Sequence, residues 1–199
     1  MLYTAKDYSG LIGTTDFGDD LLRNHFTLYE GYVTNTNKMV EALADMLKNG
    51  KTTTPEYAEL KRRMGFEFNG MRLHEYYFES LGKKGKPTAA VELGKKIAED
   101  FGNYEAWEKD FRATGSMRGI GWVILYQDNL TYRLFNQWIN EHEVGHPAGC
   151  IPILVMDVFE HAYITQYGLK RADYIEAFIK HINWGVLEGR YNAAILLSK

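Results

Sequence analysis

The sequence predicts an α+β fold: a long N-terminal antiparallel helical hairpin, followed by a C-terminal domain with a three-stranded antiparallel sheet and surrounding helices. Two observations lead to this prediction. Two long segments near the N-terminus carry apolar residues at three- and four-residue spacing, which is the period of an amphipathic helix. Later in the chain, three short runs of β-branched and aromatic residues are separated by turn residues, which is typical of strands. Helices, then strands, then helices is an order found in α+β chains.

The two long helices of the hairpin are expected over residues 19–47 and 54–81. Thr54 and Pro55 favour the start of the second helix, because threonine caps a helix N-terminus and proline suits the first helical position. Gly70 lies inside this helix, where glycine costs about 1 kcal/mol relative to alanine. We therefore expect Gly70 to pack closely against a neighbouring element.

A turn-rich break, GKKGKP at residues 82–87, is the best candidate for a domain boundary. It predicts a helical hairpin domain over residues 1–86 and an α/β domain over residues 87–199. Two shorter helices are expected directly after the break, over residues 87–102 and 103–115.

The residue pattern changes in the second half of the chain. Strands are predicted over residues 121–127, 130–139 and 149–156, where β-branched and aromatic side chains gather. Two helical segments close the chain, over residues 171–182 and 186–198. Because the strands are short and joined by turns rather than by helices, we expect an antiparallel sheet.

The composition argues against several classes of function. The chain has 199 residues, 45% of them apolar, which is enough for a substantial core. Its 23 Lys and Arg against 26 Asp and Glu leave a net charge of −3 without a basic stripe, so no nucleic-acid partner is expected. No apolar run approaches the roughly 18 residues of a membrane span and no signal-peptide pattern opens the chain, so a cytoplasmic protein is expected. The single cysteine, Cys150, excludes an internal disulfide and a cysteine-based metal site.

Four residues are candidates for a metal site. His25 and His74 fall within the two long helices, and Asp157 and His161 follow the last predicted strand. Side chains that face each other across a helical pair can build such a site, and three imidazoles with one carboxylate suit iron, manganese or zinc. Two other interpretations stay open. Each histidine can be an ordinary core or surface residue, and Asp157 can cap a helix that starts near Glu160.

Several segments carry a resemblance to a known family. The run DVFEHAY at residues 157–163 resembles the metal-binding signature of the iron/manganese superoxide dismutases. Four more segments resemble that family in its own order: YVTNTNK, FNGMRLHEYYFESL, GIGWVILY and KRADYIEAFIKHINW. The similarity extends over roughly residues 20 to 191, which makes it far more specific than any single motif.

The resemblance implies an oxidoreductase that disproportionates superoxide to oxygen and hydrogen peroxide by redox cycling of one iron or manganese ion per chain. Carried over position by position, it names His25, His74, Asp157 and His161 as the metal ligands. Zinc has no redox chemistry and would leave such a site inactive. The sequence does not choose between iron and manganese, or exclude use of both.

The resemblance also implies residues around the metal. Tyr32 matches the family's gateway tyrosine, and His142 matches the position whose side chain hydrogen-bonds the solvent at the metal. Gly70 stands where iron-type members carry their own glutamine, so His142 is the candidate in this chain. Trp122 and Phe159 are expected to form an apolar wall.

Two further implications concern the entrance and the partner. Superoxide is an anion and the chain is negative, so a local positive field is needed, and Arg171 with Lys170 are the candidates. In the family, the glutamate matching Glu160 bonds the metal-ligating histidine of a second subunit, here the partner subunit's His161. The resemblance therefore implies a homodimer, or a tetramer built from such dimers.

Two departures from the family leave an alternative open. The first ligand usually stands eight residues before the gateway tyrosine, but that position is Asn24 here, and His25 stands seven before it. The family's interface histidine and tyrosine are also absent, since their places hold Leu28 or Tyr29 and Ile164. The alternative is a non-catalytic metal-binding relative. A non-haem iron oxygenase is disfavoured, because that class uses two histidines and one carboxylate with several open positions.

Overall fold

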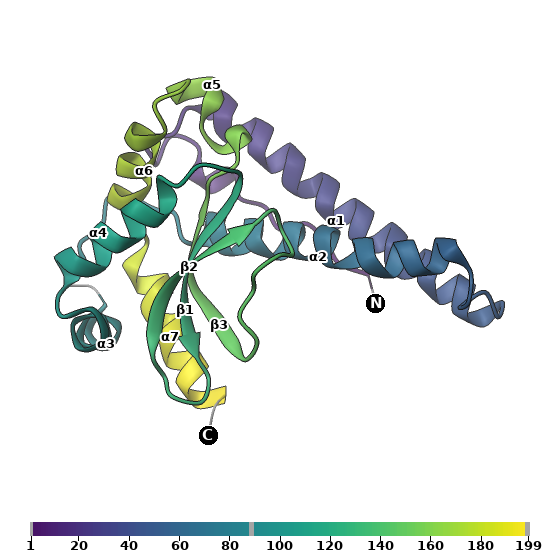
Figure 1. The fold of residues 1–199 in the computed structure, drawn as a ribbon. Coiled ribbons are helices and arrows are strands. Elements are labelled where there is room, and N and C mark those ends of the chain that lie inside the picture. The colour runs from purple at the N-terminus through teal and green to yellow at the C-terminus, as the bar shows by residue number, and fades with distance from the viewer. Residues whose placement is uncertain (1, 88–89, 198–199) are drawn as a thin grey trace.

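The helical hairpin predicted for the N-terminal part is present in the computed structural model, which describes residues 2–87 and 90–197. Helix α1 runs over Asp19–Lys48 and helix α2 over Pro55–Glu79. The two helices lie side by side, and their far ends project beyond the rest of the molecule (Figure 1). As expected, the hydroxyl of Thr54 caps α2 by accepting a hydrogen bond from the Tyr57 N–H at 3.3 Å.

The predicted three-stranded sheet is also present, so the α+β fold class is confirmed. Its strands are β1 (Gly121–Asp128), β2 (Leu134–Asn140) and β3 (Cys150–Asp157). The order is β2-β1-β3, and β1 is antiparallel to both neighbours. The middle strand is almost entirely buried, which is why its sequence GWVILYQD is apolar nearly throughout rather than alternating.

Short helices surround the sheet. They are α3 (Val91–Phe101), α4 (Tyr104–Gly115), α5 (Ile164–Tyr167), α6 (Arg171–Lys180) and α7 (Trp184–Leu197), with 3-10 turns η1 (Ser9–Leu11) and η3 (Glu160–Ala162). Helix α5 was not predicted, since four residues are too few to show a periodic pattern. Two expected helices, over residues 87–102 and 186–198, include residues 88–89 and 198, which lie outside the described residues. The last helix begins two residues earlier than predicted.

One hydrophobic core connects the hairpin to the sheet. Its buried members include Leu22 of α1, Tyr77 of α2, Val155 of β3 and Phe178 of α6. Figure 1 shows the sheet with α7 on one face and the base of α1 and α2 beside its upper end. Because the core is continuous across the break at residues 82–87, the division into two domains stays a prediction.

The N-terminal arm before α1 is fastened to the hairpin by specific bonds. The backbone N–H of Tyr3 donates to Asn37 Oδ1 at 2.8 Å, and the Lys6 ammonium donates to Glu79 Oε1 at 2.8 Å. The arm therefore covers the side of the hairpin that carries Tyr29, whose hydroxyl accepts from the Lys6 N–H. Among the described helices, none is both long enough and apolar enough to cross a membrane.

Candidate metal centre

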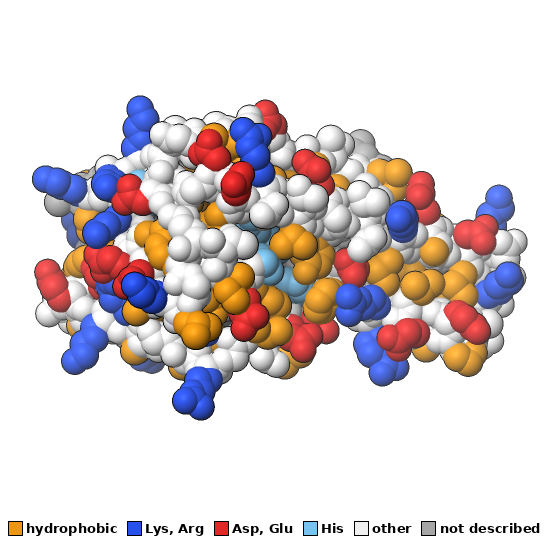
Figure 2. All heavy atoms as spheres, turned by 90° about the horizontal axis from the view of Figure 1, so that it is seen from above, with side chains coloured by type: hydrophobic (Ala, Val, Ile, Leu, Met, Phe, Trp, Pro, Cys, Tyr) orange, Lys and Arg blue, Asp and Glu red, His pale blue; other side chains and the backbone are white. Residues whose placement is uncertain are grey.

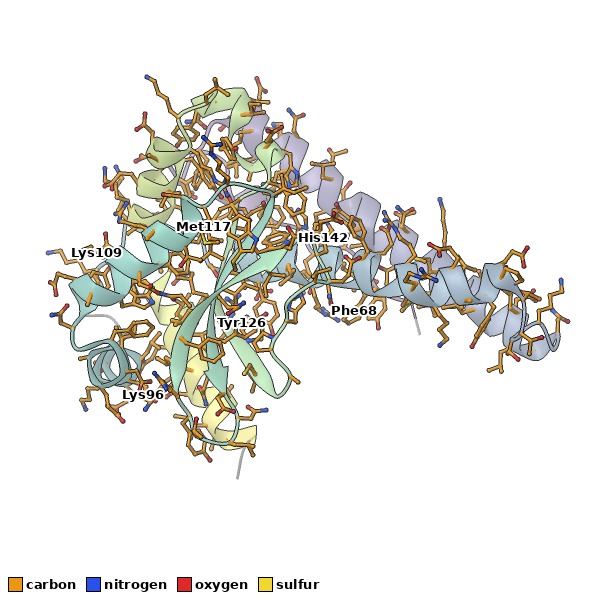
Figure 3. All side chains as sticks on the ribbon, viewed as in Figure 1. Phe68, Lys96, Lys109, Met117, Tyr126 and His142 are labelled. Atoms are coloured by element: carbon orange, nitrogen blue, oxygen red, sulfur yellow. The ribbon has the colours of Figure 1, made fainter. Side chains whose placement is uncertain are left out.

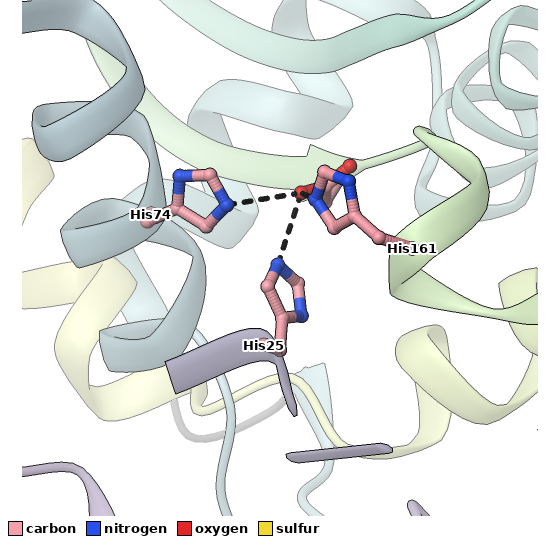
Figure 4. A group of neighbouring side chains, drawn as sticks. His25, His74 and His161 are labelled. Carbon is pink, nitrogen blue, oxygen red and sulfur yellow. Dashed lines mark hydrogen bonds and ion pairs between the residues drawn. The ribbon is translucent and has the colours of Figure 1, made fainter. Parts of the chain in front are cut away.

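Four elements bring three imidazoles and one carboxylate to a single point. His25 comes from α1, His74 from α2, Asp157 from the end of β3 and His161 from η3. Their ligand atoms all lie within 4.8 Å of one another. Figure 4 shows the three histidines pointing toward the same carboxylate oxygen. Atoms this close can surround one ion, because nitrogen and oxygen ligands sit about 2 Å from a metal.

The two oxygens of Asp157 have different tasks. Oδ1 accepts the Phe159 N–H at 2.8 Å, a bond that closes a tight turn just before the 3-10 turn that carries His161. Oδ2 faces the imidazoles, 3.2 Å from His25 Nε2, 3.1 Å from His161 Nε2 and 3.6 Å from His74 Nε2. Asp157 is therefore not the cap of the segment that begins at Glu160, whose N-cap is Phe159, and its Oδ2 is left to the imidazoles.

The hydrogen bonds of His74 leave it ready to bind a metal. Its Nδ1–H donates to the backbone carbonyl of Gly70 at 2.5 Å, which fixes the tautomer and leaves the lone pair of Nε2 directed into the centre. Nε2 is buried and has no hydrogen-bond partner among the described residues. A buried polar atom without a partner is costly, so this nitrogen fits a bound ion.

Burial and mutual charge set the ionisation of the group. Burial opposes ionisation of Asp157, but the charge of His161 and the hydrogen bonds from His161 and His25 outweigh it and hold the pKa of the carboxyl well below its usual range. Burial lowers the pKa of both His25 and His74 despite Asp157. The centre thus offers one carboxylate charge and neutral imidazoles on the two helices, the forms that bind a metal.

The seven-residue spacing on α1 keeps His25 and Tyr32 on one face of the helix. Seven residues are about 20° short of two full turns of an α-helix at 3.6 residues per turn. His25 is fully buried in the centre, whereas Asn24, at the position eight before Tyr32, is exposed. The ring of Tyr32 stacks on His74 with centroids 5.2 Å apart. The altered spacing is therefore no obstacle to forming the site.

His142 links Tyr32 to the sheet. It lies in the turn after β2 and is completely buried, and Figure 3 shows it between the end of the sheet and the helical pair. The Trp122 Nε1–H donates to His142 Nδ1 at 3.1 Å, so Nδ1 must be the acceptor. Burial lowers the pKa of His142 to about 4, so the ring is neutral at pH 7. The remaining proton is then on Nε2, which donates to Tyr32 Oη at 2.7 Å.

Tyr32 consequently keeps its own hydroxyl hydrogen for another acceptor. Burial, followed by the charges of Asp157 and Glu67, raises the pKa of Tyr32 to about 12, so the phenol is protonated at neutral pH. Its oxygen already accepts a bond from His142. The hydroxyl hydrogen is therefore available to an acceptor other than His142.

Aromatic rings enclose the centre. The ring centroid of Phe159 is 5.3 Å from that of His161 and 4.8 Å from that of His142, and Trp122 lies 5.0 Å from His74. The sequence did not identify Phe66, whose ring is 4.5 Å from His142. Its only signal was its place in the segment FEFNG of the second long helix, where an aromatic residue is ordinarily read as core.

The structure also locates the remaining predicted site residues. Arg171 donates from Nη1 to the carbonyls of Met117 and Gly119, at 3.1 and 3.0 Å. Glu160 is exposed, one residue before His161. Neither residue contacts the four ligand atoms through a hydrogen bond among the described residues, so their predicted roles stay predictions.

The fold and the centre together define a metalloprotein with one buried three-histidine, one-aspartate site between a helical hairpin and an antiparallel sheet. Comparison with known proteins agrees. The family described as iron/manganese superoxide dismutases, C-terminal domain, matches residues 88–190. An iron superoxide dismutase of Aquifex pyrophilus is 38% identical over 197 residues, covering 96% of this chain and 91% of that protein.

Two further relatives carry different metals in their names. An iron superoxide dismutase of Cupriavidus metallidurans is 36% identical, with 91% of each chain covered. A manganese superoxide dismutase of Haloferax volcanii is 33% identical, covering 87% of this chain and 86% of that protein. The chain belongs to the iron/manganese superoxide dismutase family.

Proposed function

We propose that this chain disproportionates superoxide with one iron or manganese ion held by His25, His74, Asp157 and His161. The convergence of these four ligand atoms, with the partnerless Nε2 of His74 among them, is the observation that carries the proposal. Family membership favours the enzyme over a non-catalytic relative.

The bound ion supplies the one-electron chemistry by which two superoxide anions and two protons give one oxygen and one hydrogen peroxide. The chain's task is to hold the ion in both oxidation states. One carboxylate and three imidazoles suit this task, because they are ligands that both iron and manganese accept. The Gly70 carbonyl behind His74 and the Phe159 N–H on Asp157 keep two of the ligands in place.

Tyr32 and His142 hold and deliver protons in this proposal. The bond from His142 Nε2 fixes the position of the Tyr32 hydroxyl, whose hydrogen can be donated to reduced substrate. Trp122 in turn fixes the ring of His142. Trp122 and Phe159 supply an apolar wall that excludes water and larger substrates from the centre.

The proposal includes a second subunit, which contacts the metal site of the first. Glu160 is assigned the hydrogen bond to the partner subunit's His161, which supports that imidazole from behind. In the described part of the single chain, no residue bonds to Nδ1 of His161, and this side chain is 24% exposed. Ile164, at the place of the family's interface tyrosine, is 42% exposed, which suits an apolar contact between subunits, and the place of the interface histidine is Leu28 or Tyr29, which are 41% and 1% exposed.

The proposed assembly is thus a homodimer with the same surface on both copies, or a tetramer of such dimers, located in the cytoplasm. Sedimentation of the purified protein measures the assembly. If the wild-type chain and Glu160→Gln both sediment as monomers at micromolar concentration, the assigned role of Glu160 is wrong.

The function is tested by removing metal and reconstituting separate samples with iron and with manganese. We expect about one ion per chain and superoxide consumption in at least one sample. The matched variant His142→Ala should keep its metal but lose much of its activity, since it lacks the bond to Tyr32. Bound metal without activity in either sample would refute the dismutase function.

A further inference from the structure

A solvent-open depression lies directly over the gateway tyrosine. Its volume is about 400 Å³, many times that of a diatomic anion, and its lining comes from both helices of the hairpin: Thr27, Leu28, Gly31, Tyr32, Asn35, Arg63, Phe66 and Glu67. In Figure 2, histidine side chains are visible between apolar ones where the hairpin joins the body. None of the four candidate ligands lines the depression, and Tyr32 is a lining residue that contacts one of them, His74.

The aromatic lining of the depression is in contact with the metal centre. Tyr32 bonds to His142 through its hydroxyl and stacks on the ligand His74. Phe66 packs edge-on against His142 with centroids 4.5 Å apart. A small molecule in the depression is thus separated from the centre by these two rings.

Arg63 is the cation among the eight lining residues. Its guanidinium carbon lies 3.7 Å from the centroid of the Phe66 ring, and Nε is 3.1 Å from Glu67 Oε1. The Glu67 side chain is 8% exposed and also accepts from Asn35 Nδ2 at 3.3 Å, whereas the Arg63 side chain is 50% exposed. Glu67 and Phe66 hold the guanidinium in place, and half of the Arg63 side chain remains exposed to solvent.

The guanidinium of Arg171, unlike that of Arg63, is bound to backbone carbonyls. Its Nη1 donates to two backbone carbonyls, and its guanidinium lies between the rings of Trp138 and Tyr163, at 5.6 and 5.8 Å. Among the described residues it does not line the depression. Arg63 is the better-placed cation for this opening in the single chain.

We propose that Arg63 is the cation that draws superoxide into the depression over Tyr32. The chain carries a net charge of −3 and repels an anion at long range, so capture needs a local field of opposite sign. Glu67 also lines the depression, but its side chain is only 8% exposed, so the charge that faces solvent at the mouth is that of Arg63. The inference rests on the proposed superoxide dismutase function.

The test compares Arg63→Gln with Arg62→Gln in the metal-loaded enzyme. Arg62 is the matched control, because it is the adjacent arginine, its side chain is 78% exposed, and it pairs with Glu59 away from the depression. The rate constant for superoxide is measured at about 0.01 M and about 0.15 M salt, where the Debye length is roughly 30 and 8 Å. The dissociation constant of azide, a small anion, and the thermal midpoint are measured on the same samples.

We expect Arg63→Gln to lower kcat/KM by about threefold to tenfold at low salt, to flatten its salt dependence, and to weaken azide binding. Arg62→Gln should follow the wild type, and Arg63→Lys should recover most of the rate. An equal loss at both salt concentrations, or equal effects of the two glutamine variants, would overturn the role of Arg63. An inactive wild-type chain would instead refute the proposed function.

Discussion

Replacing Gly70 by alanine tests whether Tyr32 is held by close packing. A Cβ at Gly70 would lie 2.5 Å from Cδ1, 2.7 Å from Cε1 and 2.9 Å from Cγ of the Tyr32 ring. The ring has little freedom to retreat, because its hydroxyl is bonded to His142 and its face is stacked on His74. The added methyl group must therefore displace either Tyr32 or the backbone of α2.

The expected change in the free energy of unfolding of Gly70→Ala follows from opposing contributions. Alanine is favoured over glycine within a helix by about 1 kcal/mol. Overpacking a filled site costs about 1–3 kcal/mol, and losing the bond to His142 costs about 1 kcal/mol more. Gly70→Ala should therefore lower the free energy of unfolding by about 1–3 kcal/mol, which for a chain of this length moves Tm down by roughly 2–4 °C per kcal/mol. Activity should fall as Tyr32 shifts.

Gly94→Ala is the matched control. Gly94 also lies inside a helix, α3, but an added Cβ there would meet nothing within 4 Å. This variant should be more stable than the wild type by up to about 1 kcal/mol. Urea unfolding and superoxide consumption are measured for both variants. If Gly70→Ala is as stable and as active as Gly94→Ala, the packing argument is wrong.

Three further changes have defined outcomes. Asp157→Asn removes the charge shared by the imidazoles, so elemental analysis should find well under one ion per chain; unchanged metal content would contradict the assignment. Glu79 has its pKa lowered because its bonds to Lys6 and Arg190 outweigh burial, so its stabilising effect is present above pH 4.5 and is lost as the pH falls below that. Unfolding free energies of Glu79→Gln and wild type should accordingly differ by about 1 kcal/mol at pH 7, and the difference should shrink as the pH falls below 4.5; a constant difference would argue against this. Asn103 caps α4 through Oδ1, so Asn103→Ala should cost about 1 kcal/mol in the same measurement, and no loss would mean that the cap is not stabilising.

The four candidate ligands could be named from the sequence, because each lies in a recognisable local setting. His25 and His74 stand on amphipathic helices, and Asp157 and His161 follow an apolar strand. The resemblance to a family, which extends over most of the chain, then assigned these four residues to one metal site. The residues beside the ligands were harder to assess, since Phe66 reads as ordinary core until its contact with His142 is seen.

The seven-residue spacing shows where reasoning from position alone is insufficient. The family's eight-residue spacing points to Asn24. Because one residue turns a helix by about 100°, Asn24 and its neighbour His25 lie on different sides of α1. The structure places Asn24 in solvent and His25 in the centre, because His25 and Tyr32 share a face across two helical turns. Which face is inward depends on how α1 packs, and this is a tertiary property.

By itself, the sequence predicted the class of elements and their order, because hydrophobic period and turn residues are local properties of the chain, and its resemblance to a family named four candidate ligands. Only the tertiary structure decided the tautomer of His142, the free hydroxyl hydrogen of Tyr32 and the place of Arg63 at an opening. Each of these depends on which atoms from distant segments come within hydrogen-bonding or packing distance, and spacing along the chain does not specify such distances.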